Sequence, residues 1–391
     1  MQKLLYNDKI SKNVQSIEIS GIRRFFNKAS KYPSAVSLAL GQPDLNVPDK
    51  IKTAIIEAVN NNLMTYTSNA GLQELRSEIS KYLKTFEIDY TSEEICITVG
   101  GSEGLMDVFT TLINSGDKVL IPSPAYPAYE SCVKLLGGDV INYELNDDFS
   151  INFEKLIKKL DEEKPKVMVL SYPSNPTGAV LTRADRDRLY EIIKSRELII
   201  ISDEIYSSLC YTSEYNSIAQ IKELLDKIIV VSGFSKMFSM TGLRVGYVCA
   251  RQHFMEEIMK VHQYNVSCAP SISQYGALEG LKTCLADALF MKEQFKKRRD
   301  YVFERLSKMG FEINLPEGAF YIFPSIKKLK MSSEEFCLRL LEEAGVAVVP
   351  GSAFGVLGEG YFRISYACSI SKLDDALTRI EKWLKKNSET I

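Results

Sequence analysis

The sequence predicts an α/β protein in which a mostly parallel sheet is covered by helices on both faces. Two observations support this fold class. Short, continuous apolar runs recur along the first 250 residues, and segments with helical amphipathic spacing lie between several of them. The runs expected to form buried strands are Glu94–Val99, Lys118–Ile121, Lys166–Leu170, Leu198–Ser202, Ile228–Val231 and Arg244–Ala250.

Helices are expected in the segments between these runs. Residues Glu103–Ile113 begin beside two glycines and repeat apolar side chains at helical spacing, and Asp185–Arg196 repeats them in the same way. Because strands alternate with helices, successive strands are expected to run in the same direction within one sheet.

The pattern changes after residue 285. A long amphipathic helix is expected there, followed by short strands and further helices. These elements are the helices Ala286–Met309, Ser333–Ala344 and Lys372–Lys386 and the strands Phe320–Phe323, Val346–Val349 and Phe362–Ser365. We therefore predict a large domain over residues 46–285 and a smaller α/β domain over residues 286–391, with residues 1–45 packing against the smaller one.

Composition limits the classes of partner. The chain of 391 residues has a net charge of −2 and a pI of about 6.0, which disfavours nucleic acid and anionic membranes and leaves a small molecule as the expected ligand. No signal peptide and no apolar run of about 18 residues is recognisable. The eight cysteines stand singly and there are only two histidines, so we expect no metal site and reduced cysteines in a cytoplasmic protein.

The most informative stretch is Ser232–Arg244, which follows an apolar run and contains Ser235, Lys236 and, eight residues on, Arg244. A buried lysine is costly unless it does chemistry, and a neutral lysine amine forms a Schiff base with an aldehyde. The arginine fork matches phosphate oxygens. A lysine beside a phosphate site is what a pyridoxal phosphate enzyme needs.

Other candidate residues also follow predicted strands, where ligands bind in open α/β sheets. Gly100–Gly104 opens a helix, and its first turn, with Ser102 and Glu103, could bind an anion. The glycines do not fit a dinucleotide-binding or P-loop pattern. The rigid loop after Lys118–Ile121 presents Tyr126, which could stack on a planar ring.

Further candidates lie on a rigid loop or at the end or inside of an apolar run. Asn175 lies between prolines on a stiff loop, and Asp203 ends an apolar run where its carboxylate needs a partner such as a protonated ring nitrogen, with Tyr206 three residues on. Arg363 lies inside an apolar strand and suits a substrate carboxylate. Each feature also has an ordinary structural interpretation: a tight turn, a packed tyrosine, a surface lysine or a structural ion pair.

Taken in order, these motifs resemble the class I pyridoxal phosphate aminotransferases of fold type I. The resemblance covers about residues 15 to 385, and no single motif is as specific as the ordered set. The motifs are Gly41-Gln42-Pro43-Asp44, Tyr66 in Tyr-Thr-Ser-Asn-Ala-Gly, Ser174-Asn175-Pro176-Thr177-Gly178, Asp203-Glu204-Ile205-Tyr206, Ser235-Lys236 with Arg244, and Phe362-Arg363-Ile364-Ser365. The fold implied is a large domain with a mostly parallel seven-stranded sheet between helices, and a smaller α/β domain built from both termini.

The resemblance also implies a role for each site residue. Lys236 would hold pyridoxal 5'-phosphate and move the substrate proton, and Asp203 would pair with the ring nitrogen. The other implied contacts are Asn175 and Tyr206 at the ring oxygen, Tyr126 stacked on the ring, Ser102, Glu103, Ser235 and Arg244 at the phosphate, Tyr66 at the phosphate of the neighbouring subunit of a homodimer, and Arg363, Asn175 and Gly41 at the substrate carboxylate.

The implied reaction transfers an amino group from an L-amino acid to a 2-oxo acid such as 2-oxoglutarate. Residues Ile17–Phe26 and His262–Ala269 further resemble the bacterial N-acetyl-L,L-diaminopimelate aminotransferase group, which is involved in lysine biosynthesis; aspartate or an aromatic amino acid are other donors. Two alternatives stay open. A β-lyase would use the same residues, and a regulator would need a DNA-binding module, for which the residues before Gly41 carry no pattern.

Overall fold

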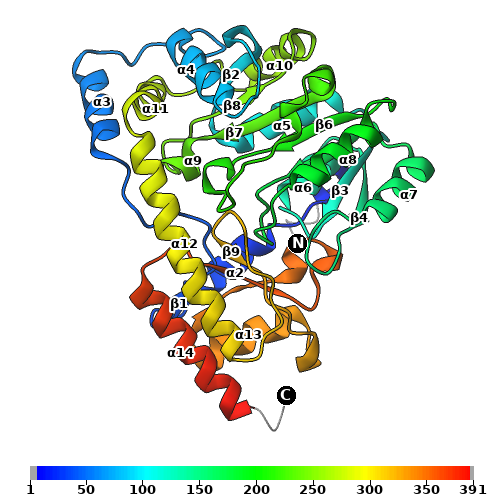
Figure 1. Cartoon of the computed structure of the whole chain (residues 1–391), viewed down its shortest axis with the longest axis vertical. Coiled ribbons are helices and arrows are strands. Elements are labelled where there is room, and N and C mark those ends of the chain that lie inside the picture. Colours follow the sequence, from blue (N-terminus) through cyan, green and yellow to red (C-terminus); the bar gives the residue numbers. More distant parts are fainter. Residues whose placement is uncertain (1–6, 388–391) are drawn as a thin grey trace.

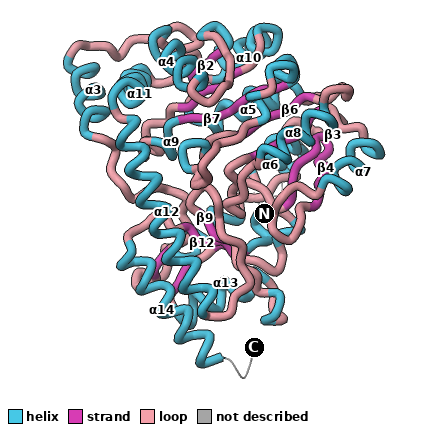
Figure 2. Tube along the Cα trace, viewed as in Figure 1, coloured by secondary structure: helices cyan, strands magenta, loops and turns pink. Residues whose placement is uncertain are grey.

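The computed structural model describes residues 7–387 and contains the predicted sheet. Residues 1–6 of the predicted N-terminal segment and 388–391 of the predicted C-terminal domain lie outside the described part. Figures 1 and 2 show the strands of the main sheet gathered in the upper half with helices around them. The seven strands are β2 (Ile95–Thr98), β3 (Lys118–Ser123), β4 (Asp139–Glu144), β5 (Val167–Ser171), β6 (Ile199–Asp203), β7 (Ile228–Gly233) and β8 (Gly246–Cys249).

The sheet has the order β2-β8-β7-β6-β5-β3-β4. Strands β3 to β7 pair in parallel, and β8 alone runs antiparallel to both of its neighbours. The predicted fold class is therefore confirmed. Because β2 and β7 both oppose β8, the carboxyl ends of the other six strands lie at one edge of the sheet.

Alternate residues of the strands face two separate apolar layers. In β7, Ile228 and Val230 belong to the layer with α4, α7, α8 and α11, whereas Ile229 and Val231 belong to the layer with α5, α6 and α10. Burial on both faces explains why these strands are continuous apolar runs in the sequence. The helices of this region are α3 (Asp49–Asn60), α4 (Gln73–Lys84), α5 (Gly100–Leu112), α6 (Ala128–Leu135), α7 (Phe153–Glu163), α8 (Arg183–Ile193), α9 (Phe234–Met237), α10 (Gln252–Asn265) and α11 (Ser271–Thr283).

A second apolar core holds the elements after residue 285 together with part of the N-terminal segment. Phe25 and Leu38 pack in it beside Phe295, Phe336 and Trp383. The helices here are α1 (Lys12–Gln15), α2 (Gly21–Ala29), α12 (Leu285–Lys308), α13 (Ser333–Ala344) and α14 (Ile370–Asn387), and the strands are β1 (Val36–Ser37), β9 (Tyr321–Ile322), β10 (Val346–Ala347), β11 (Val349–Pro350) and β12 (Phe362–Ser365).

Contacts of the N-terminal segment reach both parts of the molecule. Strand β1 pairs in parallel with β10, whereas Asn13 donates a hydrogen bond to the carbonyl of Leu135 at the end of α6. The long helix α12 descends from the sheet region to the lower part of the molecule (Figure 1). The division at residues 45 and 285 stays a prediction. Within residues 7–387, no helix has the length and apolarity that a bilayer span requires.

One strand was not expected, and several predicted bounds differ from the structure. Helix α5 begins at Gly100 and not at Glu103, and the run Val346–Val349 forms two short strands, β10 and β11. Strand β4 was not expected, because only Tyr143 in it is buried and polar residues are interspersed with apolar ones, as is usual for an edge strand. The run predicted from Arg244 begins as a strand only at Gly246, since Arg244 has a φ of 51° and belongs to the preceding turn.

Candidate active site

Most of the predicted site residues lie just beyond the carboxyl ends of neighbouring strands. Asp203 is the last residue of β6, and Lys236 lies on the short helix α9 that follows β7. Asn175 follows β5, and Tyr126 follows β3. Arg363 reaches the same region from β12 of the other core, where it bonds to Asn175. The structure thus brings together side chains that are up to 237 positions apart in the chain, from Tyr126 to Arg363.

Lys236 is half-buried and its amine has one hydrogen bond. The Nζ atom donates to the carbonyl oxygen of Gly41 at 2.7 Å and lies 5.6 Å from the centre of the Phe320 ring. Burial, together with the positive charges of Arg363 and Arg244, lowers the pKa of Lys236 from 10.5 to about 8. About one amine in ten is therefore neutral at pH 7, against fewer than about one in a thousand for an ordinary lysine.

Asp203 is a buried carboxylate held by two donors. The hydroxyl of Tyr129 donates to its Oδ2 at 2.6 Å, and the backbone N–H of Ile205 donates to its Oδ1 at 3.1 Å. Burial raises the pKa of Asp203, and these two hydrogen bonds oppose the rise. The Tyr129 hydroxyl also lies 2.8 Å from Ser171 Oγ, so its orientation is fixed from both sides.

Among residues 7–387, Arg363 is the largest side chain that is fully buried, with 1% of its surface exposed. Its guanidinium donates to Asn175 Oδ1 at 2.8 Å and to the carbonyl of Ala39 at 2.7 Å, and it lies 4.2 Å from the ring centre of Tyr321 and 4.9 Å from that of Phe354. Its Nε has no hydrogen-bond partner. Such a cation, bonded only to neutral groups, is suited to bind an anion.

Tyr321 fills the space between Gly41 and Tyr206. The hydroxyl oxygens of Tyr206 and Tyr321 are 2.8 Å apart. A Cβ atom at position 41 would lie 2.0 Å from the Tyr321 hydroxyl oxygen, so only glycine fits there without a shift. The segment that presents its carbonyl to Lys236 is therefore packed directly against this tyrosine.

The predicted phosphate residues surround the start of α5. Gly100 has a φ of 74°, and a Cβ there would lie 2.6 Å from a guanidinium nitrogen of Arg244, so the backbone and the arginine approach closely. Arg244 donates to the carbonyls of Thr241 at 2.9 Å and Val99 at 3.4 Å. Ser102 and Arg244 are exposed, whereas Ser235 is buried.

Glu103 and Tyr66 lie differently from the central group. The Glu103 carboxylate folds back to the residue before α5, where it accepts from the Val99 backbone N–H at 2.8 Å, and it contacts the His262 ring at 2.9 Å. Because both of its oxygens are engaged in this way, only the backbone of Glu103 is available at the turn. Tyr66 is 87% exposed, on the loop between α3 and α4.

Two cavities lie near this group. The first, of about 310 Å³, is lined by residues 16–21 and 24 of the N-terminal segment together with Tyr126, Glu130, Lys134 and Phe354. Phe354 also packs against Arg363 and Tyr126 against Tyr129, so this cavity adjoins the site.

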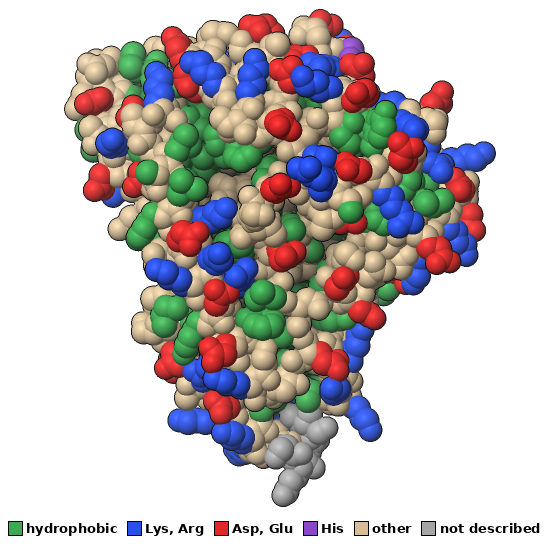
Figure 3. Space-filling model, viewed as in Figure 1, with side chains coloured by type: hydrophobic (Ala, Val, Ile, Leu, Met, Phe, Trp, Pro, Cys, Tyr) green, Lys and Arg blue, Asp and Glu red, His purple; other side chains and the backbone are tan. Residues whose placement is uncertain are grey.

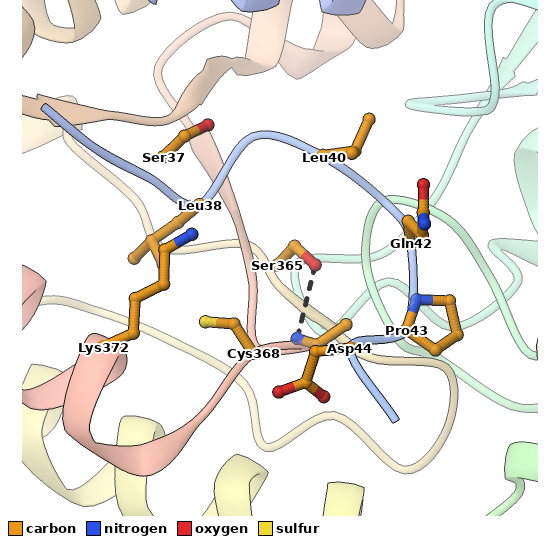
Figure 4. Close-up of a pocket in the computed structure, with 10 residues that line it drawn as sticks. Ser37, Leu38, Leu40, Gln42, Pro43, Asp44, Ser365, Cys368 and Lys372 are labelled. Carbon is orange, nitrogen blue, oxygen red and sulfur yellow. Dashed lines mark hydrogen bonds between the residues drawn. The ribbon is translucent and has the colours of Figure 1, made fainter. Parts of the chain in front are cut away.

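The second cavity, of about 230 Å³, lies behind the Gly41 segment, between residues 37–44 and 365–372 (Figure 4). Leu40 and Gln42 line it, whereas Gly41 between them faces Tyr321. Its lining includes none of the predicted site residues, and its carboxylate, Asp44, pairs with Arg298 at 2.5 Å.

Sequence reasoning missed several residues that hold the site. Tyr129 was not among the predicted site residues, although its hydroxyl contacts Asp203. Tyr321 was part of an expected strand with no role, and His262 appeared only within a stretch used for the resemblance. The position of Tyr129 three residues after Tyr126, close behind a predicted strand, was the available signal for the first of these.

The chain resembles known aminotransferases in sequence and in fold. The profile of the family "Aminotransferase class I and II" matches residues 33–380. A Bacillus subtilis protein named "Probable N-acetyl-LL-diaminopimelate aminotransferase" is 44% identical over 98% of this chain and 97% of its own length. "Aspartate aminotransferase" of Pyrococcus abyssi is 38% identical over 97% of this chain and all of its own. The solved structure of Thermus thermophilus aspartate aminotransferase with maleate superposes with a TM-score of 0.91 at 30% identity, over 95% of this chain and 99% of that one.

Proposed function

This chain belongs to the class I and II aminotransferase family, and we propose that its amino donor is N-acetyl-L,L-diaminopimelate, with a 2-oxo acid such as 2-oxoglutarate as the acceptor. It is a pyridoxal phosphate-dependent aminotransferase acting on amino acids. The single observation that carries the catalytic assignment is Lys236: a half-buried amine with a pKa of about 8, within the electrostatic influence of Asp203 and Arg363. The proposed donor rests on the Bacillus relative.

The residues present fit an anionic aldehyde cofactor. The cations Lys236, Arg244 and Arg363 outnumber the single carboxylate Asp203, and each arginine bonds only to neutral groups. A phosphate and a substrate carboxylate would balance this charge. We assign the phosphate to the α5 turn with Ser102, Ser235 and Arg244. When bound, pyridoxal phosphate supplies an aldehyde that condenses with amines and a ring that withdraws electrons from the substrate Cα.

Lys236 is proposed to act as the base at the substrate Cα. Its lowered pKa provides the neutral amine that accepts a proton, and its bond to the Gly41 carbonyl restricts where the Nζ atom lies. The reprotonation that completes the transfer needs the same amine in its protonated form. A pKa near 8 makes both forms accessible close to neutral pH.

Asp203 is proposed to hold a proton on the ring nitrogen. Its burial makes an ionised carboxylate costly unless a cation pairs with it. The donors Tyr129 and Ile205 keep it oriented and favour its charged form. Asn175 and Tyr206, both buried, are assigned to the ring oxygen, and Tyr126 to the ring face.

Arg363 is proposed to bind the substrate α-carboxylate, with Asn175 and the Gly41 segment beside it. The planar guanidinium is fixed by two hydrogen bonds and by the rings of Tyr321 and Phe354. Its orientation is set before the substrate arrives, which reduces the entropy lost on binding.

The side chain of the donor is assigned to the 310 Å³ cavity beside Tyr126 and Phe354. Its lining carries charges of both signs, from Glu18, Arg24, Glu130 and Lys134, as well as serine hydroxyls. A long donor with an amide and a second carboxylate could form hydrogen bonds and ion pairs with these groups. An aromatic side chain would displace water from the same polar groups without offering them hydrogen bonds in return, which is unfavourable.

We further propose a homodimer in which Tyr66 reaches the phosphate of the partner subunit. Several large apolar side chains are exposed along α3, the loop after it and the start of α12. Figure 1 shows α3, α11 and α12 together on one side of the molecule, and Figure 3 shows apolar side chains on that side between charges of both signs. The exposed side chains along these three segments are Ile56, Val59, Leu63, Met64, Leu285, Leu289 and Phe290. Exposed apolar patches of this kind are typical of interfaces.

A cytoplasmic location is also proposed. All eight cysteines are free thiols, and six of them are buried in the two parts of the molecule. Unpaired cysteines in this number are usual in reducing compartments.

A half-reaction screen tests the donor. Holoenzyme is mixed separately with N-acetyl-L,L-diaminopimelate, aspartate, phenylalanine and alanine, without an oxo acid, and the loss of the cofactor's aldehyde-form absorbance is followed. We expect the first donor to react fastest. A faster reaction with aspartate or phenylalanine would reject the proposed donor, and release of pyruvate and ammonia from cystathionine would indicate lyase chemistry instead.

Two variant experiments test the catalytic lysine and the dimer. Lys236→Ala should lose the visible Schiff-base absorption and nearly all turnover, and a variant that kept both would reject the role of Lys236. Lys236→Ala and Tyr66→Ala subunits, each inactive alone, should regain activity when mixed as hybrid dimers, because one of the two sites then has both residues. Hybrids without activity would reject the contribution of Tyr66 across subunits.

A further inference from the structure

A buried cluster of ionisable side chains lies beside the α5 turn, apart from the catalytic residues. His262, on α10, has none of its surface exposed. Its Nδ1 lies 2.9 Å from Glu103 Oε1 and 3.3 Å from Asp107 Oδ2, and its Nε2 lies 3.0 Å from the backbone carbonyl of Asn69. The three side chains are also close enough to one another to share an ion, but the 2.9 Å contact has the length of an N–H···O hydrogen bond.

Both ring nitrogens of His262 face acceptors. A carbonyl oxygen accepts at one side and carboxylate oxygens at the other, so each nitrogen carries a proton and the ring is an imidazolium. Burial alone lowers the pKa of His262, but the hydrogen bonds to Asp107, Cys96 and Glu103 outweigh this effect and raise the pKa well above its usual value. The charge is balanced within the cluster, which makes its burial tolerable.

One side of the cluster leads to the segment that carries Tyr66. Asn69 lies three residues after Tyr66, and its backbone carbonyl accepts from His262. The Asn69 side chain donates to the carbonyl of Ser267 at 2.7 Å, just beyond the end of α10. The backbone of this segment is thus held against α10 at two points, whereas the Tyr66 side chain projects into solvent.

The other side of the cluster leads to the phosphate turn. The second carboxylate oxygen of Glu103, Oε2, accepts from the Val99 backbone N–H at 2.8 Å. The Val99 carbonyl accepts from Arg244 at 3.4 Å, and Gly100 follows with its positive φ. A continuous path of hydrogen bonds therefore runs from Asn69 through His262, Glu103 and Val99 to Arg244.

We propose that His262 is a positioning residue that holds, through this one path of hydrogen bonds, both the segment carrying Tyr66 and the Val99–Gly100 turn at the phosphate seat. The inference rests on the proposed function, which assigns the phosphate to this turn and Tyr66 to the partner's phosphate. In a dimer built that way, His262 connects the phosphate seat of its own subunit with the residue that serves the other. We therefore expect His262 to affect the binding of the cofactor's phosphate group and not the binding of its ring.

The test compares two cofactor forms that differ only in the phosphate. Apoenzyme is titrated with pyridoxal 5'-phosphate and with pyridoxal, and each dissociation constant is measured by equilibrium dialysis and by absorbance. The variants are His262→Asn, whose amide can replace only the donor at Nδ1, and His262→Gln, whose amide can replace only the donor at Nε2. The matched control is His253→Asn, at an exposed position on the same helix.

Both His262 variants should bind pyridoxal 5'-phosphate about tenfold more weakly or worse, the effect of losing a charge-assisted hydrogen bond, while binding of pyridoxal changes by less than about twofold. The control should match the wild type for both compounds. If the His262 variants do not fold, Glu103→Gln, which keeps the side-chain size, should give the same selective loss.

The positioning role would be overturned if the ratio of the affinities for pyridoxal 5'-phosphate and pyridoxal were the same in the His262 variants as in the wild type, whether both affinities were unchanged or both fell equally. This outcome is distinct from failure of the proposed function. A wild-type protein that bound no pyridoxal 5'-phosphate at all would reject the proposed site itself, whereas tight wild-type binding with an unchanged ratio in the variants would reject only the role of His262.

Discussion

Tyr129→Phe tests the hydrogen bond that the Tyr129 hydroxyl donates to the Asp203 carboxylate. The substitution removes one oxygen atom from a ring that is 1% exposed and leaves the ring in its place. That oxygen lies 2.6 Å from Asp203 Oδ2 and 2.8 Å from Ser171 Oγ. Asp203 would keep only the backbone N–H of Ile205 as a donor. We therefore expect the pKa of Asp203 to rise further and its ionised form to be less available to a protonated ring nitrogen.

The magnitude follows from the kind of hydrogen bond that is lost. A hydrogen bond to a charged group contributes about 1.5–3 kcal/mol, which corresponds to a factor of about 10 to 150 in the balance between ionised and neutral Asp203. We expect kcat/KM to fall by about tenfold or more at neutral pH. The acid limb of its pH profile should move to higher pH, because a carboxyl with a higher pKa loses its charge earlier as the pH falls.

Steady-state kinetics between pH 5.5 and 9 measure both effects. Tyr126→Phe is the matched control, because that ring packs edge-on against Tyr129 at 5.7 Å and its hydroxyl makes no hydrogen bond to Asp203. If Tyr129→Phe changes kcat/KM by less than about twofold and leaves the acid limb where it was, then the charge of Asp203 does not depend on Tyr129 and the reasoning is wrong.

Three further predictions follow from the site. Arg363→Lys should lower kcat/KM by at least about a hundredfold, mainly through KM, because two charge-assisted hydrogen bonds lose their planar geometry; a KM near the wild-type value would contradict this. Gly41→Ala should impair activity because its Cβ would lie 2.0 Å from the Tyr321 hydroxyl, and adding Tyr321→Phe should restore part of the loss in the same assay; a double variant no better than the single one would exclude this clash as the cause. The rate at which apoenzyme captures pyridoxal phosphate should rise with pH around a midpoint near 8, since only the neutral Lys236 amine attacks an aldehyde; a stopped-flow midpoint close to 10.5 would show that Lys236 is not perturbed.

Much of the fold was predictable because parallel strands that are buried on both faces have continuous apolar runs in the sequence. Helix α13 and strand β12 have the predicted bounds, Ser333–Ala344 and Phe362–Ser365. The edge strand β4 was missed because one side of it is less buried and its residues are more polar. Local patterns identify elements that are buried on both faces more readily than elements at a boundary with solvent.

The chemistry of the site was predictable to the extent that single residues follow single strands. Lys236, Asp203 and Asn175 could each be selected because polar residues that end apolar runs must lie at the ligand-binding edge of an open sheet. Their partners could not. Tyr129 and Tyr321 had no pattern that distinguished a site residue from a packed aromatic.

The sequence by itself determined the class of fold, the order of the motifs and the residues that each strand delivers to the edge of the sheet. Only the tertiary structure decided which of these side chains meet. The contacts of Arg363 with Asn175, and of His262 with Asn69 and Glu103, join residues more than 150 positions apart. The physical reason is that a long-range hydrogen bond depends on which elements are neighbours and on how far each is shifted along the next. The hydrophobic periodicity of a single strand or helix shows which face is buried, but it specifies neither the neighbouring element nor the shift between them.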